Sequence, residues 1–84
     1  MSRPQKRPDE SKFSGRLAAR IRFLREKQGF SIDDFQVAIH ATGLPVGKST
    51  VYAWENGNAS LNPDHLPFIA EALGVSVRTL MPNE

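Results

Sequence analysis

Apolar residues recur every three or four positions in several short blocks of the chain, which is the spacing of amphipathic helices. The first block has four members on one helical face: Phe13, Leu17, Ile21 and Leu24. Ser14 is the expected cap, and Gly29 should end the helix after basic residues that suit its C-terminal dipole. The pattern therefore predicts a helix from about residue 13, with four cations facing outward: Arg16, Arg20, Arg22 and Lys27.

A second helix is predicted to begin after Ser31, a good N-cap followed by Asp33 and Asp34 in the first turn. Its apolar stripe consists of Phe35, Ala38 and Ile39, and the pattern fades near residues 42–43. The segment "TGLPVG" that follows contains two glycines and a proline, which disfavour helix. We expect it to connect two helices.

The stretch "GKSTVYAWENG", residues 47–57, has the length of a short third helix that begins near Lys48. Gly57 can supply the left-handed cap at its end. Val51 and Trp54 are three residues apart and should point into the core, whereas Tyr52 falls on the opposite face. The spacing thus predicts one core face and one exposed face.

A fourth helix should begin near Asn62, with Pro67 in its first turn, and end at Gly74. Its buried stripe is Leu66, Ile69, Ala70 and Leu73. Ser76 should cap a short fifth helix whose apolar residues Val77, Leu80 and Met81 pack on the core. We therefore predict an all-α fold of four to five short helices.

Composition narrows the class of protein. The chain has 84 residues and no cysteine, so it forms one small domain without disulfides or thiolate zinc sites. No apolar run approaches the roughly 18 residues of a membrane span, and the N-terminus has no secretory pattern. We expect a cytoplasmic protein with a flexible basic arm at residues 1–12 and a folded domain at residues 13–84.

The small net charge hides an asymmetry along the chain. Residues 1–27 carry nine Lys/Arg and three Asp/Glu, a net charge of +6, whereas residues 28–84 carry two and six, a net charge of −4. A basic first third favours a polyanionic partner. The alternative is a solvated helix face with a solubilising tail.

A helix pair at the centre of a small basic domain is typical of a helix-turn-helix module. The segments "STVYAWENG" and "HLPFIAEALGVSVRTL", with the head "RIRFLREKQGFS", resemble the lambdoid phage repressor and Cro (XRE-type) family. The resemblance covers about residues 14–81. It implies a lambda-repressor-like DNA-binding domain with the third helix in the major groove of double-stranded DNA.

The resemblance also implies which residues touch DNA. Those facing base edges would be Lys48, Ser49, Thr50, Tyr52 and Ala53. Those touching phosphates would be Asn56, Gly57, Asn58 and Ser60. It further implies an ion pair between Arg25 and Glu55 that ties the first helix to the third.

Side-chain chemistry agrees with part of this assignment. Lys48 can donate to guanine O6 or N7, and a cation at a helix N-terminus is unfavourable for stability. Tyr52 can stack on a sugar or reach a base or phosphate. Its alternatives are packing on the first helix and a dimer contact, and Lys48 has the alternative of an ordinary exposed lysine.

Three departures from the family pattern affect how the third helix would dock on DNA. The connection 40–47 makes the spacing between the helices about five residues longer than usual. Ile32 stands where the family often has a polar residue that contacts phosphate. The loop "NASLN" has no Lys or Arg, so non-specific affinity would come from the first helix and the arm.

The leading hypothesis is a sequence-specific transcriptional regulator of phage or bacterial repressor type, and the alternative is a protein-interaction module or antitoxin. A homodimer through the surface near Val75, Val77 and Met81 and a protein partner are both left open. No metal site is expected, because His40 and His65 lie in different helices without a carboxylate cluster. No cofactor is expected, and an enzyme is not expected because the sequence has no carboxylate pair, nucleophile–His arrangement or phosphate loop. "GLPVGKST" has one residue too few between its glycines for a phosphate-binding loop.

Overall fold

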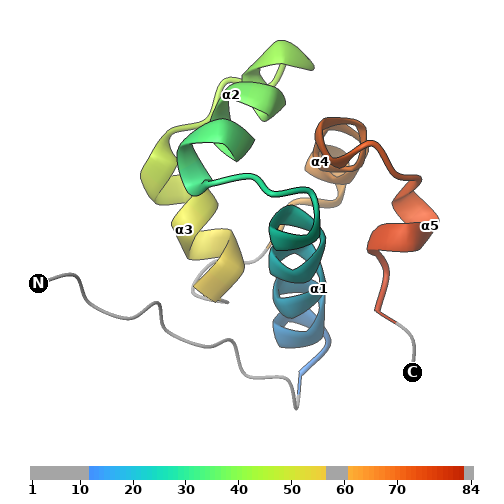
Figure 1. Ribbon diagram of the computed structural model, residues 1–84. Helices are drawn as coiled ribbons and strands as arrows, with labels where there is room; N and C mark the ends of the chain where they lie inside the picture. The colour runs from blue at the N-terminus through green and yellow to red at the C-terminus, as the bar shows by residue number, and fades with distance from the viewer. Residues whose placement is uncertain (1–11, 57–60, 83–84) are drawn as a thin grey trace, which may run out of the picture.

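The computed structural model describes residues 12–56 and 61–82, which are helical throughout apart from their connections. Figure 1 shows the arrangement, with α1 lying between α3 and α5. The elements are α1 (Phe13–Lys27), α2 (Ile32–Ala41), α3 (Lys48–Asn56), the 3₁₀ turn η1 (Pro63–His65), α4 (Leu66–Leu73) and α5 (Val77–Leu80). The described residues contain no strand, and the all-α prediction is confirmed.

Local capping explains where several helices begin and end. The Ser31 hydroxyl accepts a hydrogen bond from the Asp34 amide while the Asp34 carboxylate accepts one from the Ser31 amide, which completes a capping box. Ser76 caps α5 through the amide of Thr79. Gly74 ends α4 with a left-handed φ of 70°. These boundaries agree with the prediction because they depend on residues close in sequence.

The start of α1 differs from the prediction. The N-cap is Lys12 rather than Ser14, and no side chain caps this end. Phe13 has the spacing of the apolar stripe, but it is 48% exposed. It is the first residue of the helix, and the core begins a turn later, at Leu17.

One core joins all five helices. Helix α2 packs on α3 and α4, α1 packs on α3 and α5, and α4 packs on α5. The fully buried side chains include Ile21, Phe35, Ile39, Val51, Ile69 and Leu80. Each of these contributes about 1.5–3 kcal/mol through removal of its apolar surface from water.

Two side chains of the first third of the chain bind backbone carbonyl groups at its other end. The Gln28 side-chain amide donates to the Leu73 carbonyl over 2.8 Å, and Arg20 Nε donates to the Thr79 carbonyl over 3.1 Å. Helix C-termini leave carbonyl groups without intrahelical partners, so these bonds satisfy α4 and α5. Arg20 was expected to face outward, and the structure shows it half-buried because it holds α5.

The helices of residues 12–56 and 61–82 are short or carry many charged residues. None of them combines the length and the hydropathy that a transmembrane helix needs.

Candidate nucleic-acid interface

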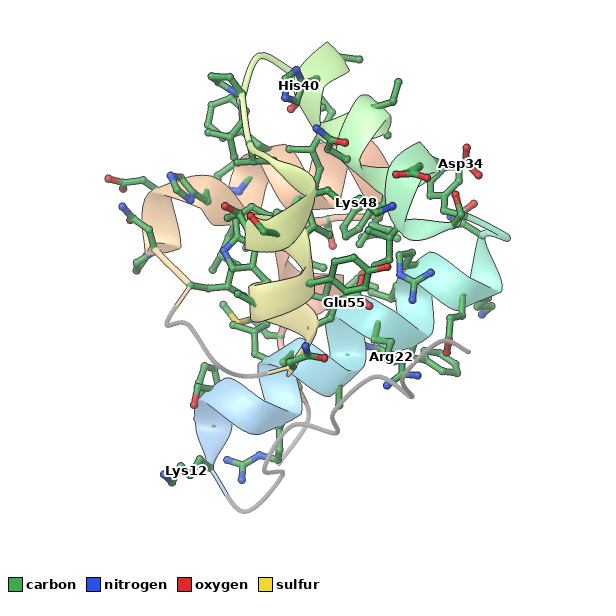
Figure 2. All side chains as sticks on the ribbon, turned by 90° about the vertical axis from the view of Figure 1, so that its left-hand side faces the viewer. Lys12, Arg22, Asp34, His40, Lys48 and Glu55 are labelled. Atoms are coloured by element: carbon green, nitrogen blue, oxygen red, sulfur yellow. The ribbon has the colours of Figure 1, made fainter. Side chains whose placement is uncertain are left out.

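Helix α3 has one face in the core and one face in solvent. Val51 is fully buried and Trp54 is 3% exposed, as their spacing predicted. The Trp54 ring lies 6.0 Å from the ring of His65, which follows α3 in the chain and comes from η1. Figure 2 looks toward α3, with Lys48 at the end near the start of α2 and Glu55 toward α1. The core contacts therefore determine which face of α3 points outward.

A buried ion pair fixes the C-terminal half of α3 to α1. Arg25 Nε lies 2.7 Å from Glu55 Oε2, and the two side chains are 8% and 0% exposed. A second guanidinium nitrogen of Arg25 donates to the Phe30 carbonyl over 2.7 Å. Arg25 thus connects α1, the junction between α1 and α2, and α3. Removing either charge would leave the other buried without its 2.7 Å counter-ion, at a cost of about 3–5 kcal/mol.

The outward face of α3 carries the residues that the resemblance assigns to base edges. Lys48, Ser49 and Thr50 are exposed, and Tyr52 is 39% exposed. Ala53 and Asn56 are half-buried at the edge of this face. Asn58 and Ser60, with Gly57, lie outside the described residues. The six candidates between Lys48 and Asn56 therefore lie together on α3, where they remain candidates for DNA contact.

Lys48 has a partner on α2 that the sequence did not indicate. Its ammonium Nζ lies 3.0 Å from Asp33 Oδ1, and the two side chains are 48% and 69% exposed. The hydrogen bond and the negative charge of Asp33 raise the pKa of Lys48 above its ordinary value. The ammonium also lies 6.0 Å from the centroid of the Tyr52 ring. Asp33 explains how a cation is accommodated at the N-terminus of α3, where the helix dipole disfavours it.

The long connection between α2 and α3 is a loop, and α2 is not extended into it. Gln36 Nε2 donates to the Val46 carbonyl over 3.0 Å, and His40 Nε2 lies 2.8 Å from the same oxygen. His40 Nε2 also lies 3.1 Å from the Val46 amide nitrogen. A neutral ring nitrogen either donates or accepts, so it makes one of these two bonds at a time. We call Gln36, His40 and Val46 the turn clamp.

The turn clamp places the start of α3. Val46 is two residues before Lys48, and Leu44 and Val46 pack partly buried against the core. Gly43 has a φ of 107°, a left-handed conformation that glycine adopts without a steric penalty. The extra residues of the connection are therefore held against α2 by defined contacts. The sequence does not indicate the turn clamp, because Gln36 and His40 bind backbone atoms of Val46, and every residue has such atoms.

Ile32 occupies its family position with an apolar side chain that is 8% exposed and belongs to the core. It cannot provide the polar phosphate contact expected at that position. The neighbouring acid Asp33, at the exposed start of α2, is the residue that faces Lys48. Within residues 12–56 and 61–82, no cluster of three or more His, Asp or Glu has the arrangement of a metal site.

Several cations of α1 take part in contacts within the protein. Arg22 forms an ion pair with Glu26 at 3.5 Å. The Arg20 guanidinium and the Lys27 ammonium lie 5.6 and 6.0 Å from the centroid of the Phe23 ring. With Arg25 buried, the basic character of α1 is only partly available to an external polyanion.

A model of the helix-turn-helix family HTH_3 matches residues 21–80. No curated protein sequence matches the chain. The fold is similar to a solved structure described as a hypothetical transcription factor NHTF from Neisseria, with a TM-score of 0.75 and 24% sequence identity. The similarity covers 96% of this chain and 88% of that one.

Proposed function

Because the chain belongs to the helix-turn-helix family HTH_3, we propose that it is a sequence-specific DNA-binding transcriptional regulator of phage or bacterial repressor type. In this proposal α3 enters the major groove of double-stranded DNA. The observation that carries it is the division of α3 into a locked core face and an exposed polar face. The fold similarity to a structure described as a hypothetical transcription factor is consistent with this function.

The roles follow from the chemistry of the exposed side chains. The Lys48 ammonium donates to guanine O6 or N7, and the Ser49 hydroxyl binds several bases with little discrimination. Tyr52, with its ring exposed, packs against a sugar or reaches a phosphate through its hydroxyl. Thr50 and Ala53 are secondary candidates, since a methyl group can contact thymine. Rigid support from the Arg25–Glu55 pair keeps these groups in one orientation.

Phosphate contacts provide most of the affinity in such complexes and make it depend on salt. We assign them to Asn56 at the end of α3, to Asn58 and Ser60 after it, and to the basic arm. Asn56 would donate to a phosphate through its side-chain amide nitrogen, because its Oδ1 is an acceptor and is buried. Few cations lie near α3, so we expect weak binding whose salt dependence comes mainly from the basic arm and α1.

Proteins of this type commonly bind two half-sites about one helical turn apart as dimers. Val75, Val77 and Met81 are only partly buried, and they form the surface that we assign to a homodimer. Sedimentation with and without DNA tests this assignment.

Selection of bound sequences from random duplexes at low salt tests the proposed function. We expect one enriched motif, whose enrichment is lost when Tyr52 is replaced by alanine. Glu71→Gln, a change at an exposed acid of α4, serves as the matched control. Selection of no motif by the unmodified chain would refute the proposal.

A protein-interaction module or antitoxin on the same fold is the second candidate. The pairing of Lys48 with Asp33 favours it, because the cation at the start of α3 already has a partner. The net charge of −4 over residues 28–84 also disfavours a polyanion there. A stoichiometric protein partner in a pull-down, together with no affinity for DNA, would select this candidate. Under either proposal the protein acts in the cytoplasm or at the nucleoid.

A further inference from the structure

Asp33 and Lys48 form an exposed ion pair at the starts of α2 and α3, and we propose that this pair recognises one G·C base pair, with Asp33 as the residue that determines specificity. The inference rests on the proposed function, in which α3 enters the major groove, and it identifies one base pair that the protein selects there. It assigns a role to an acid that otherwise weakens attraction to DNA.

Asp33 takes no part in the capping box of α2. The capping box at the start of this helix uses Ser31 and Asp34. The Asp33 side chain is 69% exposed, and its contact in the structure is Lys48. An acid in the first turn stabilises a helix by about 0.3–1 kcal/mol through the helix dipole, and Asp34 already supplies such a charge. Asp33 therefore acts on the fold mainly through Lys48, and the two side chains form an exposed unit that a ligand can reach.

The pair presents donors and acceptors side by side. One ammonium proton of Lys48 is directed at Asp33 Oδ1 over 3.0 Å, and an ammonium has three protons. Two donors and the accepting capacity of the carboxylate are then left for a ligand. The ammonium is charged at neutral pH at its ordinary pKa of 10.5, and Asp33 raises that pKa further.

The major-groove edge of a G·C base pair complements this arrangement. Guanine offers two adjacent acceptors, N7 and O6, and cytosine offers the N4 amino donor beside them. The ammonium can bind both guanine acceptors while the carboxylate accepts from cytosine N4. In an A·T base pair the adenine amino group separates N7 from thymine O4, so the ammonium meets one acceptor. The carboxylate then lies near thymine O4 and the methyl group, which repel it or offer no hydrogen bond.

Contacts within the protein fix the backbone positions of Asp33 and Lys48 before DNA binds. Asp33 follows directly on Ile32, which is in the core, and Lys48 follows the turn clamp by two residues. The two backbones are thus held at a spacing that lets the side chains meet. Exposed side chains can adjust to the groove without disturbing the core.

The experiment measures binding of the full chain to its selected duplex and to duplexes with each base pair substituted in turn. We compare the unmodified chain with Asp33→Asn, Lys48→Met and the double variant at one fixed salt concentration. Glu71→Gln is the control, since it also removes one exposed negative charge. Removal of an acid raises affinity for all DNA, so only the ratio of affinities for G·C and A·T at each position is informative.

We expect one position of the selected site to be G·C and to be preferred over A·T by about tenfold or more. Asp33→Asn should lower this preference about tenfold at that position, Glu71→Gln should leave it unchanged, and the effect of Asp33→Asn should vanish in the Lys48→Met background. Binding of DNA with equal preferences in Asp33→Asn and Glu71→Gln would overturn this inference alone. Absence of any DNA binding by the unmodified chain would overturn the proposed function and this inference together.

Discussion

The two ends of α3 each carry an ion pair to another helix, and the two pairs differ in burial. At the C-terminal end Arg25 and Glu55 are 8% and 0% exposed, and their charged atoms are 2.7 Å apart. At the N-terminal end Lys48 and Asp33 are 48% and 69% exposed, at 3.0 Å. Similar distances therefore occur in different solvent environments. The buried pair holds α3 in place, and the exposed pair is available for exchange with a ligand.

The physical reason is solvent screening. In water the Coulomb attraction of an exposed pair is weak and nearly balanced by the side-chain entropy that it costs, for a net of about 0–1 kcal/mol. In the core each charge has lost its hydration, and the attraction of the other charge compensates much of that loss. The exposed pair, Lys48 with Asp33, can therefore be opened at little cost. Opening the buried pair, Arg25 with Glu55, would destabilise the whole domain.

The largest effect should come from breaking the buried pair. Glu55→Gln strands the Arg25 guanidinium beside Phe30, and we expect a loss of about 3–5 kcal/mol in the free energy of unfolding. Thermal and urea unfolding monitored by circular dichroism measure the loss. A decrease no larger than that of the exposed-site control Glu71→Gln would contradict the assigned role of the pair.

Replacing both charges together should be less harmful than removing one. In Arg25→Met combined with Glu55→Leu, no charge remains in the core, and apolar replacements of buried pairs are often neutral or stabilising. We expect the double variant to unfold at a higher temperature than Glu55→Gln. The reverse order would show that the hydrogen bond from Arg25 to the Phe30 carbonyl matters more than the charges.

The turn clamp should show an intermediate effect. Gln36→Ala combined with His40→Ala removes the side-chain bonds to the Val46 carbonyl, each worth about 0.5–1.5 kcal/mol. We expect a loss of about 1–2 kcal/mol in stability. Hydrogen exchange should accelerate at residues 42–47 more than in α1. Equal acceleration throughout the chain would mean that the clamp acts on global stability and not on the turn.

The smallest effect on stability belongs to the exposed pair. Asp33→Asn should change the free energy of unfolding far less than Glu55→Gln does, because solvent screens the exposed pair. It should also lower the pKa of Lys48 toward the ordinary value of 10.5, because Asp33 is what raises it. The pair's contribution is present at neutral pH and is lost as the pH rises above 10.5 through the folded-state pKa. Side-chain NMR titration of Lys48 measures the shift, and an unchanged pKa in Asp33→Asn would contradict the pairing.

Much of the fold could be predicted because its signals are local. Ser31, Ser76 and Gly74 act on atoms within a few residues, so their spacing in the chain is their spacing in space. The predicted length of α3 and the burial of Val51 and Trp54 are also confirmed. Arg25 and Glu55 are 30 residues apart, and they could be paired only through the family resemblance. The prediction for Phe13 was wrong because periodicity does not show where a core begins.

The sequence by itself determined the helices, the caps at Ser31, Gly74 and Ser76, and the division of α3 into two faces. These features depend on residue spacing, which helical geometry converts directly into direction. The tertiary structure alone decided which exposed groups meet: Asp33 with Lys48, and Gln36 and His40 with Val46. Such contacts join exposed side chains to one another or to backbone atoms, so they leave no periodic pattern in the sequence. They arise only after the core has fixed the position of α2 relative to α3.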